Sequence, residues 1–138
     1  MRLIYDDFGC INKKLPRHYD LVLKKYGIKC CVFNPFRPFL SAVLNNRDHR
    51  KIAIIDGHTG ITGGINLADE YINIGSKFGH WKDTSILLRG EGVWSLTVMF
   101  LSMWDALTQT EENYNHFRPY LYQDGIIRAP GIVQPYND

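Results

Sequence analysis

Apolar and polar positions along the first third of the chain predict a strand, a helix and a second strand. Short apolar runs at residues 2–7 and 28–33 have the length and composition of buried strands. The stretch from Pro16 to Tyr26 has apolar residues at the three- and four-residue spacing of a helix, with Gly27 just after its end. This order of elements predicts a βαβ unit.

The remaining elements alternate in the same way. Residues 49–56 and 59–64 predict a pair of strands around the turn signal at Asp56-Gly57. Residues 81–89 predict a further strand, and residues 91–107 predict a helix whose wide apolar surface is expected to pack against the sheet. The chain after residue 108 is expected to be irregular. This alternation predicts an α/β fold, in which a mixed β-sheet is flanked by helices.

One short window holds the clearest candidate chemistry. His49, Lys51, Asp56, Gly63-Gly64 and Asn66 fit the pattern H-x-K-x4-D-x6-G-G-x-N. Alternate side chains of an extended strand share a face, so His49 and Lys51 are expected to stand side by side and act on one ligand. An imidazole next to a fixed cation suits the cleavage of a phosphodiester.

The rest of the pattern supplies polar groups and close backbone approach. Asp56 falls on the opposite face of the predicted strand from His49 and Lys51, and it ends the strand at a turn signal. There it either acts at the site or forms a local hydrogen bond. Gly63 and Gly64 lack a Cβ, which lets the backbone approach a phosphate closely. Asn66 can then donate an amide N–H to a phosphate oxygen.

The pattern resembles the motif of the phospholipase D superfamily, and every position of that motif is matched. The stretch Gly63-Gly64-Ile65-Asn66-Leu67-Ala68-Asp69-Glu70-Tyr71 looks like the version found in bacterial cardiolipin synthases. The similarity continues at Trp81-Lys82-Asp83-Thr84, in an aromatic-rich helix, and at Val133-Gln134-Pro135-Tyr136. The resemblance implies a phospholipase D-like half, formed by residues 1–138 as a single domain.

The resemblance also implies the roles of the site residues. One histidine, His49 or its counterpart, attacks phosphorus to form a phosphohistidine, and the other protonates the leaving oxygen. Lys51 and Asn66 hold the oxygens on which negative charge builds, while Asp83 orients the active-site histidine of the other half. The implied reaction transfers a phosphatidyl group between two phosphatidylglycerol molecules to give cardiolipin and glycerol, with no cofactor and no metal.

Members of this family carry the motif twice, whereas this chain carries it once. None of the other four histidines is followed by both a Lys two residues on and an Asp five residues further. The chain is therefore expected to be the first catalytic half of a cardiolipin synthase. A strand that begins at Arg2 favours an excised half, with membrane-spanning segments and the second motif elsewhere in the parent protein.

Two alternatives stay open at this point. Besides half of a cardiolipin synthase, the chain can be a self-dimerising phosphodiesterase or nuclease of the same superfamily. The second alternative is a noncatalytic module that binds phosphate or lipid. The expected partners are phosphatidylglycerol, a second motif-bearing half or a second copy of this chain, and a membrane surface. The parent protein is expected at the bacterial inner membrane, with this part soluble and facing the cytoplasm.

Composition narrows the class of partner. Sixteen Lys and Arg against fourteen Asp and Glu leave a net charge of +2, without the dense basic patch that is typical of a nucleic-acid-binding protein. No transmembrane segment is expected, because the most apolar run, from Val93 to Met103, is interrupted by polar residues and is shorter than the roughly 20 residues that span a bilayer. Cys10, Cys30 and Cys31 lack metal-ligand spacing and are expected to be small buried thiols.

Overall fold

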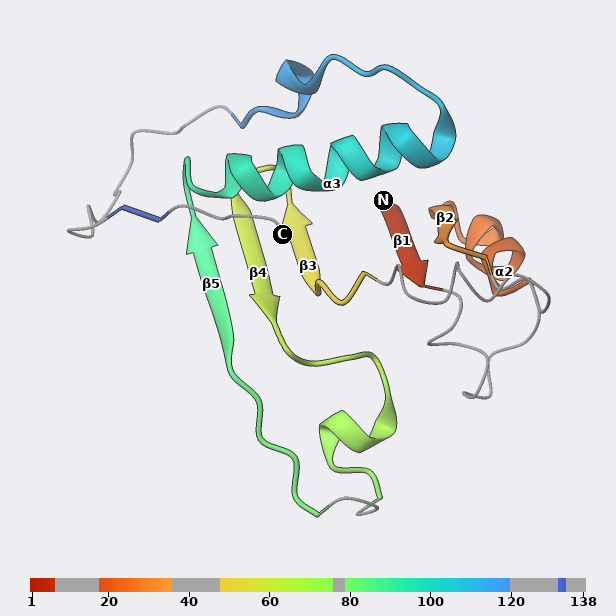
Figure 1. The fold of residues 1–138 in the computed structure, drawn as a ribbon, viewed down its shortest axis with the longest axis vertical. Coiled ribbons are helices and arrows are strands. Elements are labelled where there is room, and N and C mark those ends of the chain that lie inside the picture. The colour runs from red at the N-terminus through yellow and green to blue at the C-terminus, as the bar shows by residue number, and fades with distance from the viewer. Residues whose placement is uncertain (7–17, 36–47, 76–78, 120–131, 134–138) are drawn as a thin grey trace. The chain divides into compact units, whose positions relative to one another are not determined.

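The computed structural model describes residues 1–6, 18–35, 48–75, 79–119 and 132–133. The chain divides into two compact units. Unit 1 comprises Met1–His49 and Met103–Glu111, and unit 2 comprises Arg50–Ser102 and Glu112–Asp138. Figure 1 shows the helices and strands of each unit. The structure contains parallel and antiparallel strand pairs flanked by helices, which confirms the predicted α/β class.

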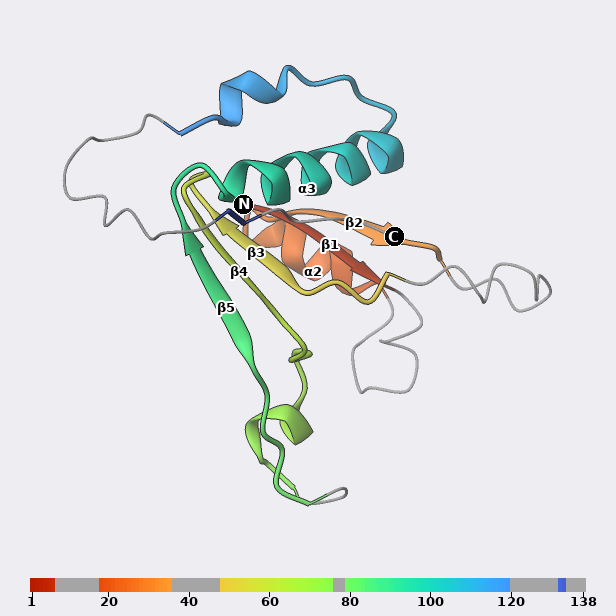
Figure 2. The ribbon, with the colours of Figure 1, turned by 60° about the vertical axis from the view of Figure 1, so that its left-hand side comes forward.

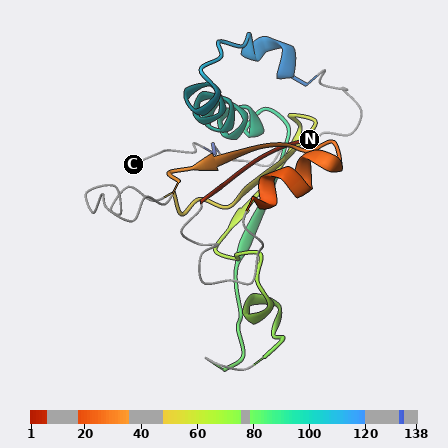
Figure 3. The ribbon, with the colours of Figure 1, turned by 90° about the vertical axis from the view of Figure 1, so that its right-hand side faces the viewer.

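Unit 1 is built on a parallel pair of strands. β1 (Arg2–Asp6) pairs with β2 (Lys29–Phe33), and Leu3 lies opposite Cys30 in the register. The helix α2 (Tyr19–Lys25) connects them in the chain and packs beside β2, as Figure 3 shows. A parallel pair needs a long crossover connection, and this arrangement confirms the predicted βαβ unit.

The helix α2 ends close to the predicted position. Gly27 has a φ of 74°, a left-handed conformation that glycine adopts without steric cost, and its N–H donates to the carbonyl of Lys24. The helix begins at Tyr19, directly after His18. The predicted start at Pro16 lies outside the described residues.

Unit 2 contains a three-stranded antiparallel sheet. Its strands are β3 (Ile52–Ile55), β4 (Thr59–Gly63) and β5 (Ser85–Arg89), and β4 lies in the middle, paired with both neighbours. Along β3, Ile52 and Ile54 are half-buried while the residues between and after them are exposed. The predicted alternation of the strand is therefore confirmed.

Two strands of unit 2 are shorter than predicted. The strand predicted over residues 49–56 begins at Ile52, so His49 and Lys51 precede it. The strand predicted over residues 81–89 begins at Ser85, so Asp83 also lies outside the ladder. The reason is that β4 ends after five residues and offers no further hydrogen-bonding partner to either neighbour.

The core of unit 2 lies between the sheet and the first turns of the helix α3 (Val93–Thr108). Val93 and Leu96 are buried there. At the second residue of β4, a Cβ on Gly60 would lie 2.9 Å from Leu96 Cδ1 and 3.3 Å from Val93 Cγ1. The absence of a side chain at Gly60 thus lets the helix approach the sheet, and α3 crosses the end of the sheet where β4 begins (Figures 1 and 2). This packing confirms the expected role of the helix.

The helix α3 contributes to both units. Its residues up to Ser102 belong to unit 2, and its last turns belong to unit 1. In unit 1 the guanidinium of Arg2 lies 5.2 Å from the ring centre of Trp104, a cation–π contact. No helix in the described part of the chain is both long enough and apolar enough to cross a membrane.

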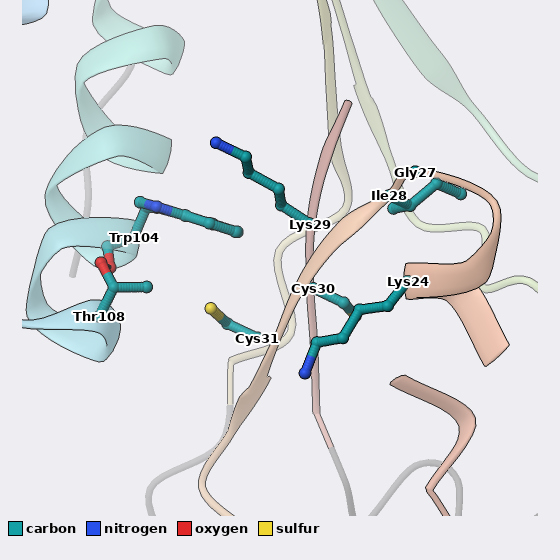
Figure 4. Close-up of a pocket in the computed structure, with 8 residues that line it drawn as sticks. All are labelled: Lys24, Gly27, Ile28, Lys29, Cys30, Cys31, Trp104 and Thr108. Atoms are coloured by element: carbon teal, nitrogen blue, oxygen red, sulfur yellow. Dashed lines mark hydrogen bonds between the residues drawn. The ribbon is translucent and has the colours of Figure 1, made fainter. Parts of the chain in front are cut away.

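Unit 1 also contains an open cavity of about 360 Å³ (Figure 4). Its lining comes from α2, β2 and the last turns of α3 and consists of Lys24, Gly27, Ile28, Lys29, Cys30, Cys31, Trp104 and Thr108. Partial burial raises the pKa of both thiols, and the negative charge of Asp20 adds to this effect at Cys30. Protonated thiols are weak nucleophiles and ligands. Cys30 and Cys31 are half-buried rather than buried, and Cys10 lies outside the described residues.

A tight turn joins β3 to β4. Asp56 and Gly57 have φ values of 51° and 64°, and the N–H of His58 donates to the carbonyl of Ile55 at 3.1 Å. Two central residues with positive φ and this hydrogen bond define a type I′ turn, which Asp-Gly favours. Gly57 is buried against the carbonyl of Phe117, which leaves no room for a Cβ. The predicted turn is therefore confirmed.

A short segment after α3 is regular, although the sequence predicted an irregular chain there. Tyr114–Phe117 forms a 3-10 helix, and the side chain of Asn113 caps it by accepting a hydrogen bond from the backbone N–H of Asn115. The guanidinium of Arg118 then lies 5.3 Å from the ring centre of Trp94 on α3. These contacts hold this segment in unit 2.

We expect Gly60→Ala to destabilise the chain by about 1 to 3 kcal/mol, because the added methyl group overpacks the contact with α3. Urea unfolding of the purified chain measures this change. Gly92→Ala is the matched control, since a Cβ there meets only Val133 Cβ at 4.0 Å. Equal effects of the two substitutions would contradict the close approach at Gly60.

Candidate functional site

The predicted site residues gather mainly at the end of the sheet away from the hairpin turn. β4 stops there at Gly63, which pairs with Ser85. Lys51 is half-buried and directly precedes β3. Because Ile52 pairs with Thr62, one further step of the antiparallel register places Lys51 opposite Gly63. Lys51 therefore lies at the edge where the ladder ends.

Asp83 accepts three hydrogen bonds at this end of the sheet. Its Oδ1 accepts hydrogen bonds from the backbone N–H of Gly64 at 3.2 Å and of Thr84 at 2.7 Å. Its Oδ2 accepts a hydrogen bond from the indole Nε1–H of Trp81 at 3.1 Å. Three donors thus fix the orientation of an exposed carboxylate.

These donors favour the ionised form of Asp83. The hydrogen bond from Trp81 lowers the pKa of the carboxyl most, and the N–H groups of Thr84 and Gly64 and the positive charge of Lys51 lower it further, against partial desolvation. An ionised carboxylate offers about four acceptor positions, and three are occupied here. Asp83 can therefore still accept one further hydrogen bond at an exposed position.

The two glycines of the motif have a structural reason within the chain. A Cβ on Gly64 would lie 2.8 Å and 3.0 Å from the two carboxylate oxygens of Asp83. A Cβ on Gly63 would lie 2.8 Å from Ser85 Cβ and 2.9 Å from the carbonyl oxygen of Thr84. The sequence alone suggested a close approach to phosphate, whereas the structure shows a close approach to the segment that carries Asp83.

Asn66 follows the glycines and is half-buried. Its Nδ2 donates to the hydroxyl of Tyr71 at 2.6 Å. An amide NH₂ has two N–H donors, so one can serve Tyr71 and the other a phosphate oxygen. The hydrogen bond to Tyr71 fixes which way the amide of Asn66 points.

Three residues around this site were missed by the sequence analysis, namely Tyr71, Asn73 and Trp81. The backbone N–H of Trp81 donates to Asn73 Oδ1 at 2.6 Å, and Asn73 Nδ2 donates back to the carbonyl of Trp81 at 3.1 Å. The rings of Tyr71 and Trp81 meet edge to face, with centres 4.6 Å apart. Residues two apart on an extended segment share a face. This rule could have predicted from the sequence that the side chains of Trp81 and Asp83 lie close together.

His49 precedes β3, and Asp56 lies in the predicted hairpin turn. His49 is exposed, closes the first stretch of unit 1 and is linked to Lys51 by one intervening residue. Asp56 is exposed in the hairpin turn, at the opposite end of β3 from Lys51. Five residues of extended chain separate the Cα atoms of Lys51 and Asp56 by roughly 16 Å. The structure thus brings Lys51, Asn66 and Asp83 to one end of the sheet and places Asp56 at the other.

The donors at this end of the sheet suit an anion. Lys51 provides a positive charge, and Asn66 provides an amide N–H. Hydrogen bonds already occupy three of the acceptor positions of the Asp83 carboxylate. Lysine and amide N–H groups are common partners of phosphate oxygens. In the described part of the chain, no group of three or more His, Cys, Asp or Glu is arranged to hold a metal ion.

The chain is similar to several bacterial proteins. A cardiolipin synthase of Alkalihalophilus pseudofirmus is 39% identical over 136 residues, which are 97% of this chain and 26% of that protein. A cardiolipin synthase of Geobacillus kaustophilus is 43% identical over 109 residues, which are 78% of this chain and 21% of that protein. An uncharacterized protein of Streptococcus mutans is 49% identical over 139 residues, or all of this chain and 29% of that protein.

The chain is thus related to proteins named cardiolipin synthase. It spans about a quarter of the length of the curated relatives it matches. No family model and no solved structure matches it.

We expect Asp83→Asn to destabilise the chain in a pH-dependent way. Because the folded state lowers the pKa of Asp83, its charge stabilises the fold fully above the ordinary aspartate pKa of about 3.9. That contribution is lost as the pH falls through the lower folded-state pKa. Urea midpoints of both proteins between neutral and acidic pH should therefore converge in acid. Asp69→Asn, in the same segment between β4 and β5, controls for the loss of one negative charge, and a pH-independent difference would contradict the expectation.

Proposed function

We propose that this chain is the first catalytic half of a cardiolipin synthase of the phospholipase D type. The observation that carries the proposal is the placement of Lys51 and Asn66 at one end of the sheet, beside the fixed carboxylate of Asp83, in a chain that also has His49 two residues before Lys51. The relatives named cardiolipin synthase support the same conclusion.

The proposed reaction has two displacement steps at phosphorus. A lone pair of one imidazole, that of His49 or of its counterpart, forms a P–N bond while the P–O bond to the glycerol head group breaks. The second imidazole gives its proton to the departing alkoxide, which leaves as glycerol. The hydroxyl of a second phosphatidylglycerol then transfers its proton to that imidazole and attacks phosphorus, and the P–N bond breaks to give cardiolipin.

Lys51 and Asn66 stabilise the charge that develops in both steps. The nonbridging oxygens become more negative in each pentavalent transition state, and a cation and an amide N–H placed beforehand bind that charge more strongly than they bind the substrate. Asp83, with one open acceptor position, orients the histidine of the second half. Asp56 lies one strand length away, where its contribution is to the hairpin turn.

The second histidine must come from another motif-bearing half. This chain holds one copy of the motif, and two imidazoles are needed on opposite sides of one phosphorus. The proposal therefore places phosphatidylglycerol, at a membrane surface, between this chain and that half. A second copy of this chain is the alternative source of the histidine.

A chimera tests the proposal directly. This chain replaces the corresponding segment of the Alkalihalophilus pseudofirmus cardiolipin synthase, to which it aligns over 97% of its length. We expect the chimera to form cardiolipin from phosphatidylglycerol vesicles. His49→Ala and Lys51→Ala should each reduce kcat about 100-fold or more, because each removes a group that acts in the transition state.

The sequence supplies a matched control for this experiment. His80 and Lys82 repeat the His-x-Lys spacing and are exposed, but Leu87 stands where the motif requires Asp. His80→Ala and Lys82→Ala should leave the rate within about twofold. If the His49 and Lys51 variants of a folded chimera were as active as these controls, the motif assignment would be wrong.

We also expect the 138-residue chain alone to fold but to release almost no glycerol from phosphatidylglycerol vesicles. Removing one member of a nucleophile and acid pair costs several orders of magnitude in rate. Sedimentation of the same sample shows whether the chain is monomeric. Robust turnover by a monomer would contradict the half-site proposal, while turnover that rises with dimer concentration would support a self-completing phosphodiesterase.

A further inference from the structure

A continuous line of contacts joins two of the proposed site residues. Asn66 Nδ2 donates to the hydroxyl of Tyr71 at 2.6 Å. The ring of Tyr71 meets that of Trp81 edge to face, at 4.6 Å between centres and 67° between planes. The indole N–H of Trp81 then donates to Asp83 Oδ2 at 3.1 Å. We refer to Tyr71 and Trp81 as the aromatic bridge.

The backbone ladder cannot position these two polar residues relative to each other. The last pair of the sheet on this side joins Gly63 to Ser85. Asn66 and Asp83 both lie beyond that pair, at the base of an arm that links β4 to β5. Their relative position therefore depends on side-chain contacts across the arm, of which the aromatic bridge is one continuous set.

Trp81 is restrained more than a packing role requires. Its backbone N–H and its carbonyl both bond to the side chain of Asn73, at 2.6 Å and 3.1 Å, and its ring rests on Tyr71. The side chain is 37% exposed, so it contributes little to a core. Three restraints therefore act on a partly exposed indole, whose N–H donates to Asp83. Such restraints are typical of a residue that preorganises a neighbouring polar group.

We propose that Tyr71 and Trp81 are positioning residues, which fix the amide of Asn66 and the carboxylate of Asp83 in the orientations that phosphoryl transfer needs. This inference rests on the proposed function for its catalytic consequence. Tyr71 holds one N–H of Asn66, so the other is directed toward a phosphate oxygen. Trp81 holds Oδ2 of Asp83, so the remaining acceptor position keeps one direction. Neither aromatic residue touches the reacting atoms.

Two conservative substitutions separate the two ends of the aromatic bridge. Tyr71→Phe removes the hydroxyl that accepts from Asn66 and keeps the ring against Trp81. Trp81→Phe removes the indole N–H that donates to Asp83 and keeps an aromatic ring near Tyr71. Tyr114→Phe and Trp94→Phe are the matched controls, since both residues belong to unit 2, where Tyr114 lies in the 3-10 helix and Trp94 lies on α3 beside Arg118.

The kinetic readout uses the chimera with phosphatidylglycerol vesicles. Each bridge variant should lower kcat about 10- to 100-fold, as is typical when a residue that orients an active-site group is lost. KM should change by less than about threefold, because Lys51 and the lipid contacts are retained. The two control variants should keep the rate of the unsubstituted chimera.

The spectroscopic readout uses the 138-residue chain and does not depend on turnover. In Trp81→Phe the carboxyl carbon of Asp83 should titrate at a higher pH by NMR, because the largest cause of its lowered pKa is removed. In Tyr71→Phe that titration should stay in place, while the side-chain amide protons of Asn66 lose their hydrogen-bonded shift and exchange faster with water.

The outcomes separate this inference from the proposed function. If both bridge variants matched the controls in kcat and left the NMR signals of Asn66 and Asp83 unchanged, the positioning role would be overturned. A loss of thermal stability together with unchanged kcat would overturn it as well. If His49→Ala left the chimera active, the proposed function would fail, and the NMR measurements would still decide whether the bridge holds the two polar groups.

Discussion

The carboxylate of Asp83 accepts backbone hydrogen bonds where the backbone ladder of the antiparallel sheet ends. Beyond the last pair, Gly63 with Ser85, the N–H of Gly64 donates to a side-chain oxygen instead of a carbonyl. The two strands can therefore separate into the arm without leaving this backbone donor unpaired. The same carboxylate binds Trp81, so the geometry of the arm is built outward from one acidic side chain.

This arrangement also explains how a negative charge can lie beside a proposed phosphate site. Repulsion between a carboxylate and a phosphate would oppose binding if the carboxylate had no partners. Three hydrogen bonds and the nearby charge of Lys51 stabilise the ionised form of Asp83. Under the proposed function, its remaining acceptor position faces a histidine that becomes positively charged during the reaction, which turns the negative charge into an advantage.

The elements of the fold could be predicted from periodicity, whereas the starts of β3 and β5 could not. Alternation placed Ile52 and Ile54 on the half-buried face, and the Asp-Gly signal located the hairpin turn. The extent of each strand depends on the length of its neighbour, which a single sequence does not reveal. The spacing of residues that predicted this strand also predicted that Lys51 lies along it, and Lys51 directly precedes β3 in the structure.

The contacts around the candidate site were less accessible to sequence reasoning. Tyr71 and Trp81 are ten residues apart and meet only because the arm folds back on itself through the side chain of Asn73. Asp56 lies in the turn that the Asp-Gly signal predicted, but its place in the motif does not reveal that this turn lies away from the other polar groups. Its positive φ directs it into the turn, one strand length from Lys51.

The Asp56-Gly57 turn also has a consequence in time. In the hairpin that it closes, Ile55 and Thr59 are only four residues apart, whereas every pair between β1 and β2 joins residues 27 apart. Closing short loops costs less entropy, and hairpins form within about 1 to 10 μs. We therefore expect the hairpin to be protected from hydrogen exchange earlier during refolding than the parallel pair. A buried glycine far from the candidate site would then determine how early the edge that carries Lys51 begins to form.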